Sequence, residues 1–436
     1  MAISVRNIRI KNLRWWVIGF IALATAINYL DRQNLPVAIS EIKKTISITD
    51  TQYGIINSLF LLAYGTMYAV GGRIVDVLGS RTGYAIMIIW WSVANALHGL
   101  VSTVMGLGIA RFLLGIGEGG GFPSSAKAVS EWFPTRERSF AFGIFNTGSS
   151  LGAVIAPPLI ALVIAAFDWR WAFYISGALG LVWVVGWLKF YSVPSKNKYI
   201  TSEEKNYIET SLANDARTQE GNQLLPWRRL FGYRQTWGLI TIKFLTDAGW
   251  FFFIFWLPKY LHDVRGLDIA GIGTYAWIPY AFAGCGSFVG GWFSSYLLRK
   301  EFSLDTARKI PLGIAMALLP ISLFITNASF AAAILFFSMA MFGHQWWSTI
   351  VQTLAADLFP SKIVGSVAGL MGCIGTYGAM LYSFAIGFVI EQFGYGPAFI
   401  ISGVLHPISF ILVFVFIKKI EPVKLPTLSA VTKTTV

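Results

Sequence analysis

The sequence predicts an all-α integral membrane protein with twelve transmembrane helices, arranged as two six-helix pseudo-symmetric halves. Three observations lead to this prediction. The chain has 436 residues, of which 55% are hydrophobic and only 13% charged, about half the charged share of a soluble domain. Apolar runs of about twenty residues recur along the chain, each long enough to cross about 30 Å of hydrocarbon. One long polar segment, residues 191–234, divides these runs six and six.

The apolar runs are continuous rather than alternating, which favours helices over a barrel, because a helix satisfies its backbone hydrogen bonds within one segment. The first run is too long for the core of a signal peptide and leads directly into further spans. In chain order, we place the spans near residues 15–38, 51–73, 82–101, 104–128, 139–162, 170–190, 235–260, 269–298, 310–326, 330–356, 364–390 and 397–417.

The polar central segment predicts a linker between two halves. Within it, TSEEKNYIETSLAN is typical of a short amphipathic helix, because Thr201 can cap the helix start and Glu204 follows three residues later. We interpret the segment as a solvated linker, with a regulatory docking site as the alternative. The predicted organisation is an N-terminal six-helix half (1–190), a cytoplasmic linker (191–234), a C-terminal six-helix half (235–418) and a cytoplasmic tail (419–436).

The basic balance of the chain is a signal of topology. Its formal net charge is +13, and most of its 34 Lys and Arg fall on one predicted side: at the N-terminus, in the central segment and in the C-terminal tail. Positive charge marks the cytoplasmic side of a membrane protein, so we expect both termini in the cytoplasm. The short outer loop after the first span favours a bacterial inner membrane. We expect no nucleic-acid partner.

Two loops at corresponding places in the halves are similar. The loop between spans 2 and 3 reads GGRIVDVLGSR, and the loop between spans 8 and 9 reads GGWFSSYLLRK. Both begin with two glycines and end in basic residues, although Ser295 stands where the first loop has Asp76. Internal repeats of this kind are common in secondary transporters, so the loops suggest a repeat.

The first of these loops resembles the signature loop of the major facilitator superfamily in Gly72, Asp76, Gly79 and Arg81. Further segments, NYLDR (28–32), RFLLGIGEGGGFP (111–123) and EWFPTRERS (131–139), resemble the anion:cation symporters of that superfamily, and within them the hexuronate and other sugar-acid transporters. The resemblance implies the major facilitator fold. It also implies that the signature loop holds the two halves together in one state of a transport cycle.

In the first half, four charged residues fall well inside predicted spans, where each costs roughly 3 kcal/mol or more to insert: Asp31, Arg32, Arg111 and Glu118. Asp31 and Arg111 come to about the same height, which favours a contact between them, whereas Glu118 lies two turns from Arg111, about 10 Å away. Asp31 and Arg32 point about 100° apart on a helix, so one can face a helix interface and the other a cavity. A purely structural charge network is the alternative for all four.

Polar side chains are fewer in the second half. Lys243 and Asp247 stand four residues apart near the middle of span 7, a spacing that favours mutual neutralisation, and a substrate role for Lys243 is the other interpretation. His344 and Gln345 fall at mid-depth in span 10 and are candidate polar contacts. We interpret His406 as a structural residue near a membrane edge.

The function predicted is proton-coupled symport, as uptake, of a sugar-acid anion such as galacturonate or glucuronate by alternating access. Arg32 suits a two-pronged contact with a carboxylate, and Asp31 and Glu118 would carry protons, linked through Arg111. The resemblance supports these roles and adds Tyr64 and residues 146–149 as substrate contacts. The predicted substrate-binding residues are Arg32, Tyr64, Asn146, Ser149, Lys243, His344, Gln345 and Tyr377.

Alternatives are a carrier for another organic anion (aldonate, aldarate or small carboxylate) and a non-transporting membrane sensor or enzyme. The sequence has no HExxH pattern, no nucleophile elbow and only 4 His, which argues against an enzyme or a metal site. We therefore expect no catalytic residue, no metal and no cofactor apart from co-transported protons. The expected partners are the organic anion, protons and the lipid bilayer, with the protein as a monomer.

Overall fold

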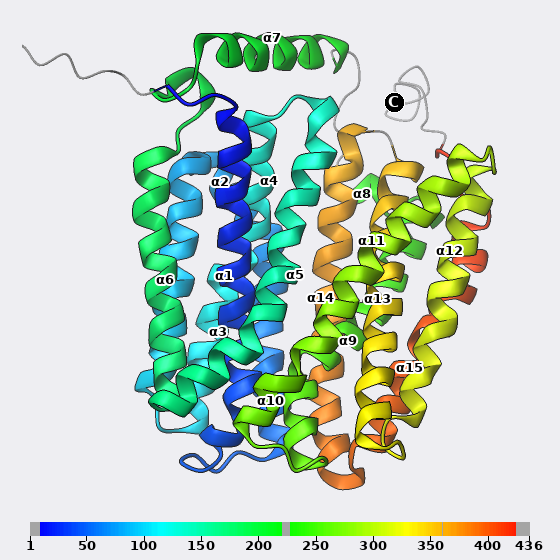
Figure 1. Cartoon of the computed structure of the whole chain (residues 1–436). Coiled ribbons are helices and arrows are strands. Elements are labelled where there is room, and N and C mark those ends of the chain that lie inside the picture. The colour runs from blue at the N-terminus through cyan, green and yellow to red at the C-terminus, as the bar shows by residue number, and fades with distance from the viewer. Residues whose placement is uncertain (1–8, 220–226, 360, 424–436) are drawn as a thin grey trace, which may run out of the picture.

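Long helices lie side by side in two groups, one from each half of the chain (Figure 1). The computed structural model describes residues 9–219, 227–359 and 361–423, and no β-strand occurs among them. The first group contains α1 (Leu13–Ile42), α2 (Asp50–Leu97), α3 (Val104–Gly119), α4 (Gly121–Trp132), α5 (Thr135–Ala166) and α6 (Trp169–Phe190). The second contains α9 (Arg234–Asp263), α10 (Ile269–Tyr275), α11 (Trp277–Arg299), α12 (Leu304–Leu318), α13 (Phe330–Leu358), α14 (Ser361–Phe393) and α15 (Tyr395–Leu412).

All twelve predicted spans coincide with helical segments, which confirms the fold class, but some spans are joined or broken. Spans 2 and 3 are continuous in α2 and meet at Gly79, whose φ of 76° reverses the chain where a residue with a side chain would be strained. Span 4 is divided between α3 and α4, and span 8 between α10 and α11. Eight helical segments of the described residues are by themselves long and apolar enough to cross a membrane.

The glycines of the segment RFLLGIGEGGGFP let α3 approach α2 closely. A side-chain carbon at Gly115 would overlap the carbonyl oxygen of Phe60, and one at Gly119 would overlap that of Tyr64. Small residues at such crossings are how membrane helices gain packing contact without a hydrophobic driving force. This crossing sets the position of Glu118, which lies between the two glycines.

One end of the molecule carries α7 (Ser202–Gln219), the start of α1 and the last helical segment, Val413–Ile417 (Figure 1). We call this end the terminal face. Here Glu204 accepts hydrogen bonds from the backbone N–H groups of Leu13 (2.8 Å) and Arg14 (3.2 Å), and it pairs with the Arg14 guanidinium at 2.8 Å. Asn12 at the start of α1 makes no side-chain cap. The predicted linker helix therefore exists and caps α1. The domain boundaries stay a prediction.

At the other end, the opposite face, polar contacts hold the two halves together. Asp50 of α2 pairs with Lys259 of α9 at 2.7 Å and with Lys43 at 3.1 Å. Glu391 of α14 accepts the backbone N–H of Thr51 at 2.8 Å. These contacts close the interface between the halves at this face.

Beside these contacts, α2 and α14 cross with backbones almost touching. A side-chain carbon at Gly54 would overlap the carbonyl oxygen of Ser383, and one at Gly387 would overlap that of Asp50. The close approach leaves no channel between α2 and α14 at this crossing. The interface between the halves is therefore sealed here by main chain.

Candidate functional site

A cavity of about 1020 Å³ lies between the two halves. Its walls come from α1, α2, α3, α4 and α5 of the first half and from α9, α11, α13 and α14 of the second. It extends toward the terminal face as far as Phe142, Thr353 and Ala368, which lie near the ends of their helices. Because the opposite face is closed, the cavity is reached from the terminal face.

A buried ion pair lies in the wall of this cavity. The Nε and Nη2 atoms of Arg32 lie 3.0 Å and 2.9 Å from Oε2 of Glu118, and the two side chains are 3% and 0% exposed. Asn28, one turn before Arg32, accepts a further hydrogen bond from Nη2 at 3.2 Å. Oε1 of Glu118 has no hydrogen-bond partner among the described residues. The pair therefore keeps one free acceptor position.

Aromatic rings surround the guanidinium of Arg32. The ring centres of Tyr29 and Tyr64 both lie 4.8 Å from its central carbon, and that of Phe60 lies 5.6 Å away. Contacts of this kind stabilise a cation by about 2 kcal/mol or more when water is excluded. They help to hold Arg32 in the cavity wall.

Asp31 points away from the cavity, and its predicted contact with Arg111 is wrong. Oδ1 of Asp31 accepts a hydrogen bond from the Asn95 amide at 2.7 Å. Arg111 instead donates to the backbone carbonyl oxygen of Arg32 at 3.0 Å and lies over the ring of Phe60 at 4.7 Å. Equal depth does not make two side chains meet, because each must also point to the same interface.

Lys243 and Asp247 form the predicted pair on α9. Nζ of Lys243 lies 2.6 Å from Oδ1 of Asp247, and both residues line the cavity. The cavity thus has a cation–carboxylate pair in each half, and each pair is neutral as a whole. A bound anion would add uncompensated negative charge unless a proton entered as well.

His344 lies in the cavity wall, on α13. Its ring stacks on Trp250 at 5.0 Å with the planes 7° apart, and its Nδ1 lies 3.0 Å from Nε2 of His406 on α15. The placement of His406 near a membrane edge is therefore wrong, since it lies behind His344 inside the bundle. The contact fixes the orientation of the His344 ring, because one of the two nitrogens must donate to the other.

The other predicted substrate contacts divide into two groups. Tyr64, Asn146, Ser149 and Gln345 line the cavity together with Arg32. Tyr377 is not among the lining residues, and its hydroxyl lies 3.1 Å from that of Thr66. None of these placements tests a role in binding, so the roles stay predictions.

Sequence reasoning missed several polar residues of the cavity. Asn28 could have been found, because it lies one helical turn before Arg32 on the same face. Ser348 and Gln352 follow Gln345 along α13, where Gln352 donates to Ser348 at 3.1 Å. Trp250 gave no signal, because apolar and aromatic residues surround it in the sequence on both sides.

The signature loop makes its described contacts within the first half. Ser80 donates to Oε2 of Glu131, as does the hydroxyl of Tyr191 at 2.8 Å. Arg81 donates to the backbone carbonyl oxygen of Leu188. Gly72 faces Pro123 of α4. The side chain of Asp76 lies outside the described part, so the role of Gly72, Asp76, Gly79 and Arg81 between the halves stays a prediction.

Relatives of known function are similar over most of the chain. The hexuronate transporter of Escherichia coli K12 is 33% identical over 412 residues, which are 93% of this chain and 94% of that protein. The galacturonate transporter of Dickeya chrysanthemi is 37% identical over 299 residues, 68% of this chain and 86% of that protein. The D-galactonate transporter of Escherichia coli O6:H1 is 30% identical over 432 residues, 96% of this chain and 100% of that protein.

Solved structures share the fold at lower identity. A bacterial homolog of the human lysosomal transporter Spinster, in an inward-facing and occupied conformation, superposes with a TM-score of 0.73 at 18% identity, over 94% of this chain and 98% of that one. The xylose transporter XylE of E. coli, in an inward open conformation, gives 0.70 at 14% identity, over 96% and 99%. The sequence profile of the Major Facilitator Superfamily matches residues 21–343 and 303–434. The chain therefore belongs to the Major Facilitator Superfamily and is a multi-pass membrane transporter rather than an enzyme.

Proposed function

We propose that this protein takes up a sugar-acid anion, such as a hexuronate, together with protons, by alternating access. The observation that carries the proposal is the Arg32–Glu118 pair, buried in a cavity between the halves that is closed at one face. The names of the relatives, transporters of hexuronate, galacturonate and D-galactonate, support the substrate class.

The terminal face is the cytoplasmic face in this proposal, because most Lys and Arg outside the spans lie there. The cavity then opens to the cytoplasm, which is the state that releases substrate during uptake. A cysteine at Lys44, in the loop after α1, should react with a membrane-impermeant maleimide in intact bacteria, and one at Glu209 on α7 should react only after lysis. Labelling of position 209 in intact cells would contradict the orientation.

Arg32 binds the substrate carboxylate in place of Glu118. A guanidinium can donate two parallel hydrogen bonds to a carboxylate, and both donors now directed at Glu118 would turn to the substrate. Leaving Glu118 charged but unpaired in a buried wall would be costly. A proton on Glu118 removes that cost, so binding of the anion and binding of a proton favour one another.

The sugar hydroxyls are bound by the polar residues around the rest of the cavity. Asn146 and Ser149 come from the first half, and His344 and Gln345 from the second. A ligand that bridges both halves stabilises whichever state brings them together around it, and this is the condition for alternating access. Asp31 is the second proton position, outside the cavity wall, and Arg111 positions the backbone of Arg32.

Aldarates, which carry two carboxylates, are the second candidate substrate class. The observation that favours them is the second cation, Lys243, which lines the same cavity from the other half. A relative, the probable galactarate/D-glucarate transporter GudP of Escherichia coli K12, is 30% identical over 429 residues. Lys243→Gln should weaken inhibition of uptake by an aldarate more than inhibition by a hexuronate if the second carboxylate binds there.

Uptake into proteoliposomes tests the proposed function. The purified protein should concentrate radiolabelled galacturonate or glucuronate when the side of entry is made acidic, and a proton ionophore should abolish the accumulation. Binding of sugar acids without any uptake or exchange would indicate a sensor. An uptake rate and an accumulation that do not depend on the pH gradient would contradict proton coupling.

A further inference from the structure

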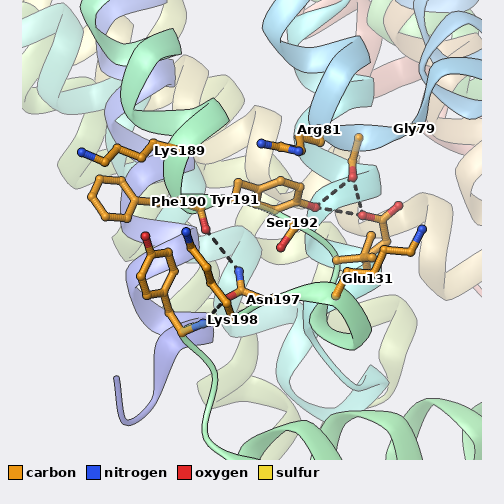
Figure 2. Close-up of a pocket in the computed structure, with 13 residues that line it drawn as sticks. Gly79, Arg81, Glu131, Lys189, Phe190, Tyr191, Ser192, Asn197 and Lys198 are labelled. Atoms are coloured by element: carbon orange, nitrogen blue, oxygen red, sulfur yellow. Dashed lines mark hydrogen bonds between the residues drawn. The ribbon is translucent and has the colours of Figure 1, made fainter. Parts of the chain in front are cut away.

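A second pocket lies at the terminal face, outside the cavity between the halves. It has a volume of about 460 Å³ and is formed within the first half. Its walls are the kink of α2 at Gly79–Arg81, the end of α6 at residues 189–190, the segment at residues 191–199 and Glu131 of α4 (Figure 2). The volume equals that of roughly fifteen water molecules, enough for a phosphate group and the carbons attached to it.

The walls of this pocket carry an excess of positive charge. Arg81, Lys189, Lys196 and Lys198 line it, against a single carboxylate, Glu131. None of the three lysines lies within ion-pair distance of a carboxylate in the part of the chain that the structure describes. All four cationic side chains are exposed.

The carboxylate of Glu131 already accepts hydrogen bonds from neighbouring side chains on one side of the pocket. It accepts hydrogen bonds from Ser80 and from the hydroxyl of Tyr191 (2.8 Å), and Figure 2 shows this group on one side with Lys189 on the other. Tyr191 is buried and Trp132 packs against its ring at 6.3 Å. The carboxylate therefore braces the wall, and the lysines stay available to an anion.

An exposed apolar face of α6 leads directly to the rim of this pocket. Val182, Val185 and Leu188 lie three residues apart on α6 and are 69%, 68% and 39% exposed, and Phe190 at the end of the helix is 49% exposed. None of them lines the cavity between the halves. In a membrane transporter such a face meets lipid chains, so the pocket lies at the height of the headgroups.

We propose that this pocket binds a phosphate group, and that its source is the headgroup of an anionic glycerophospholipid whose chains lie along α6. Basic pockets between helices at a membrane surface are suited to such headgroups. A soluble phosphate offers the same chemistry to the lysines but makes no use of the apolar face. The site does not depend on which substrate the cavity carries.

Native mass spectrometry of the purified full chain tests this proposal. Phosphatidylglycerol, phosphatidylcholine, inorganic phosphate and glycerol 3-phosphate are each added to the wild-type protein and to K189Q/K196Q/K198Q. The matched control is K11Q/K300Q/K419Q, which removes three lysines from the same face outside the pocket. The conservative variant K189R/K196R/K198R keeps the charge, and size-exclusion chromatography checks that every variant is folded.

The wild-type protein should retain phosphatidylglycerol over phosphatidylcholine. The Gln variant of the pocket should bind phosphatidylglycerol at least about tenfold more weakly, since each cation near a charged surface contributes roughly fivefold. The control and the Arg variant should bind it as the wild type does. Tight binding of inorganic phosphate or glycerol 3-phosphate that displaces the lipid would overturn the lipid source. Equal binding of every phosphate compound to the wild type and the Gln variant would overturn the site.

Discussion

Arg32 donates both of its short hydrogen bonds to the same oxygen of Glu118, and the other oxygen, Oε1, has no partner among the described residues. A proton can therefore be added at Oε1 without breaking a hydrogen bond that the pair already makes. Once Glu118 is neutral, the interaction energy between Glu118 and Arg32 falls, because a hydrogen bond to a neutral carboxyl is weaker than one between two charged groups. In the proposed mechanism, the guanidinium is then available to a substrate carboxylate.

Arg32→Ala should weaken sugar-acid binding by at least about tenfold, because a hydrogen bond to a charged group contributes roughly 1.5–3 kcal/mol. Arg32→Lys should fail nearly as badly, since an ammonium cannot form the planar two-pronged contact. Substrate-induced thermal shift of the purified protein measures the effect. The control is Arg170→Ala, which changes an arginine outside the cavity. Unchanged affinity in a folded Arg32→Ala protein would remove Arg32 from the site.

Glu118→Gln imitates the protonated carboxyl, so this variant should bind substrate and exchange it across the membrane at every pH tested. It should not concentrate substrate in response to a pH gradient, because it has no proton to release. Wild-type uptake should rise as the side of entry is made more acidic, and the variant should lose this dependence. Proteoliposomes with and without a gradient, beside counterflow exchange, give the measurement, with Glu209→Gln as the control. Accumulation driven by the gradient in Glu118→Gln would exclude Glu118 as the coupling residue.

At the scale of the helices, the sequence predicts what depends on period and composition. The spans, the break in polarity at the linker and the Lys243–Asp247 pair all follow from spacing along one helix. Pairing between residues of different helices cannot be predicted from spacing along one helix. Asp31 and Arg111 match in depth, yet Arg32 meets Glu118 instead, because Arg32 points into the cavity wall whereas Asp31 points toward Asn95 of α2.

The capping of α1 by Glu204 is also a contact between distant elements that spacing could not reveal. Glu204→Gln should lower the stability of the first half by about 1 kcal/mol, because it weakens a helix cap and removes an ion pair with Arg14. A lower midpoint of thermal unfolding in detergent would show the effect. Glu203→Gln, one residue earlier and exposed, is the matched control and should leave the midpoint unchanged. Equal midpoints for both variants would mean that α7 does not stabilise α1.

At the scale of the whole molecule, the two halves meet at the opposite face and part toward the terminal face. The Lys259–Asp50 pair joins α9 to α2 across that closed end. In the proposed alternating-access cycle these contacts break in every turnover, so their strength would set the balance between the two states. Weakening them shifts that balance without touching the cavity.

Lys259→Gln should increase the population that is open at the opposite face. Spin labels at Lys44 and Val264, on a background with Cys285 and Cys373 replaced by Ser, report the distance between the halves there. The variant should show a longer or broader distance distribution than the parent protein. Lys309→Gln, which removes a lysine paired within the second half, should not. An unchanged distribution in Lys259→Gln would show that other contacts hold the closed end.

The crossing of Gly54 and Gly387 bears on the energetic cost of that opening. When two helices separate, the side chains packed between them usually become exposed to water. This exposure costs a free energy of about 25 cal/mol for each square ångström of apolar surface. Where glycine faces glycine, there is almost no such surface to wet, and water can hydrate the backbone oxygens as they separate. The crossing therefore excludes solutes while the helices are in contact, and little free energy is needed to hydrate it when they separate. A contact that prevents leakage in this way need not slow the transport cycle.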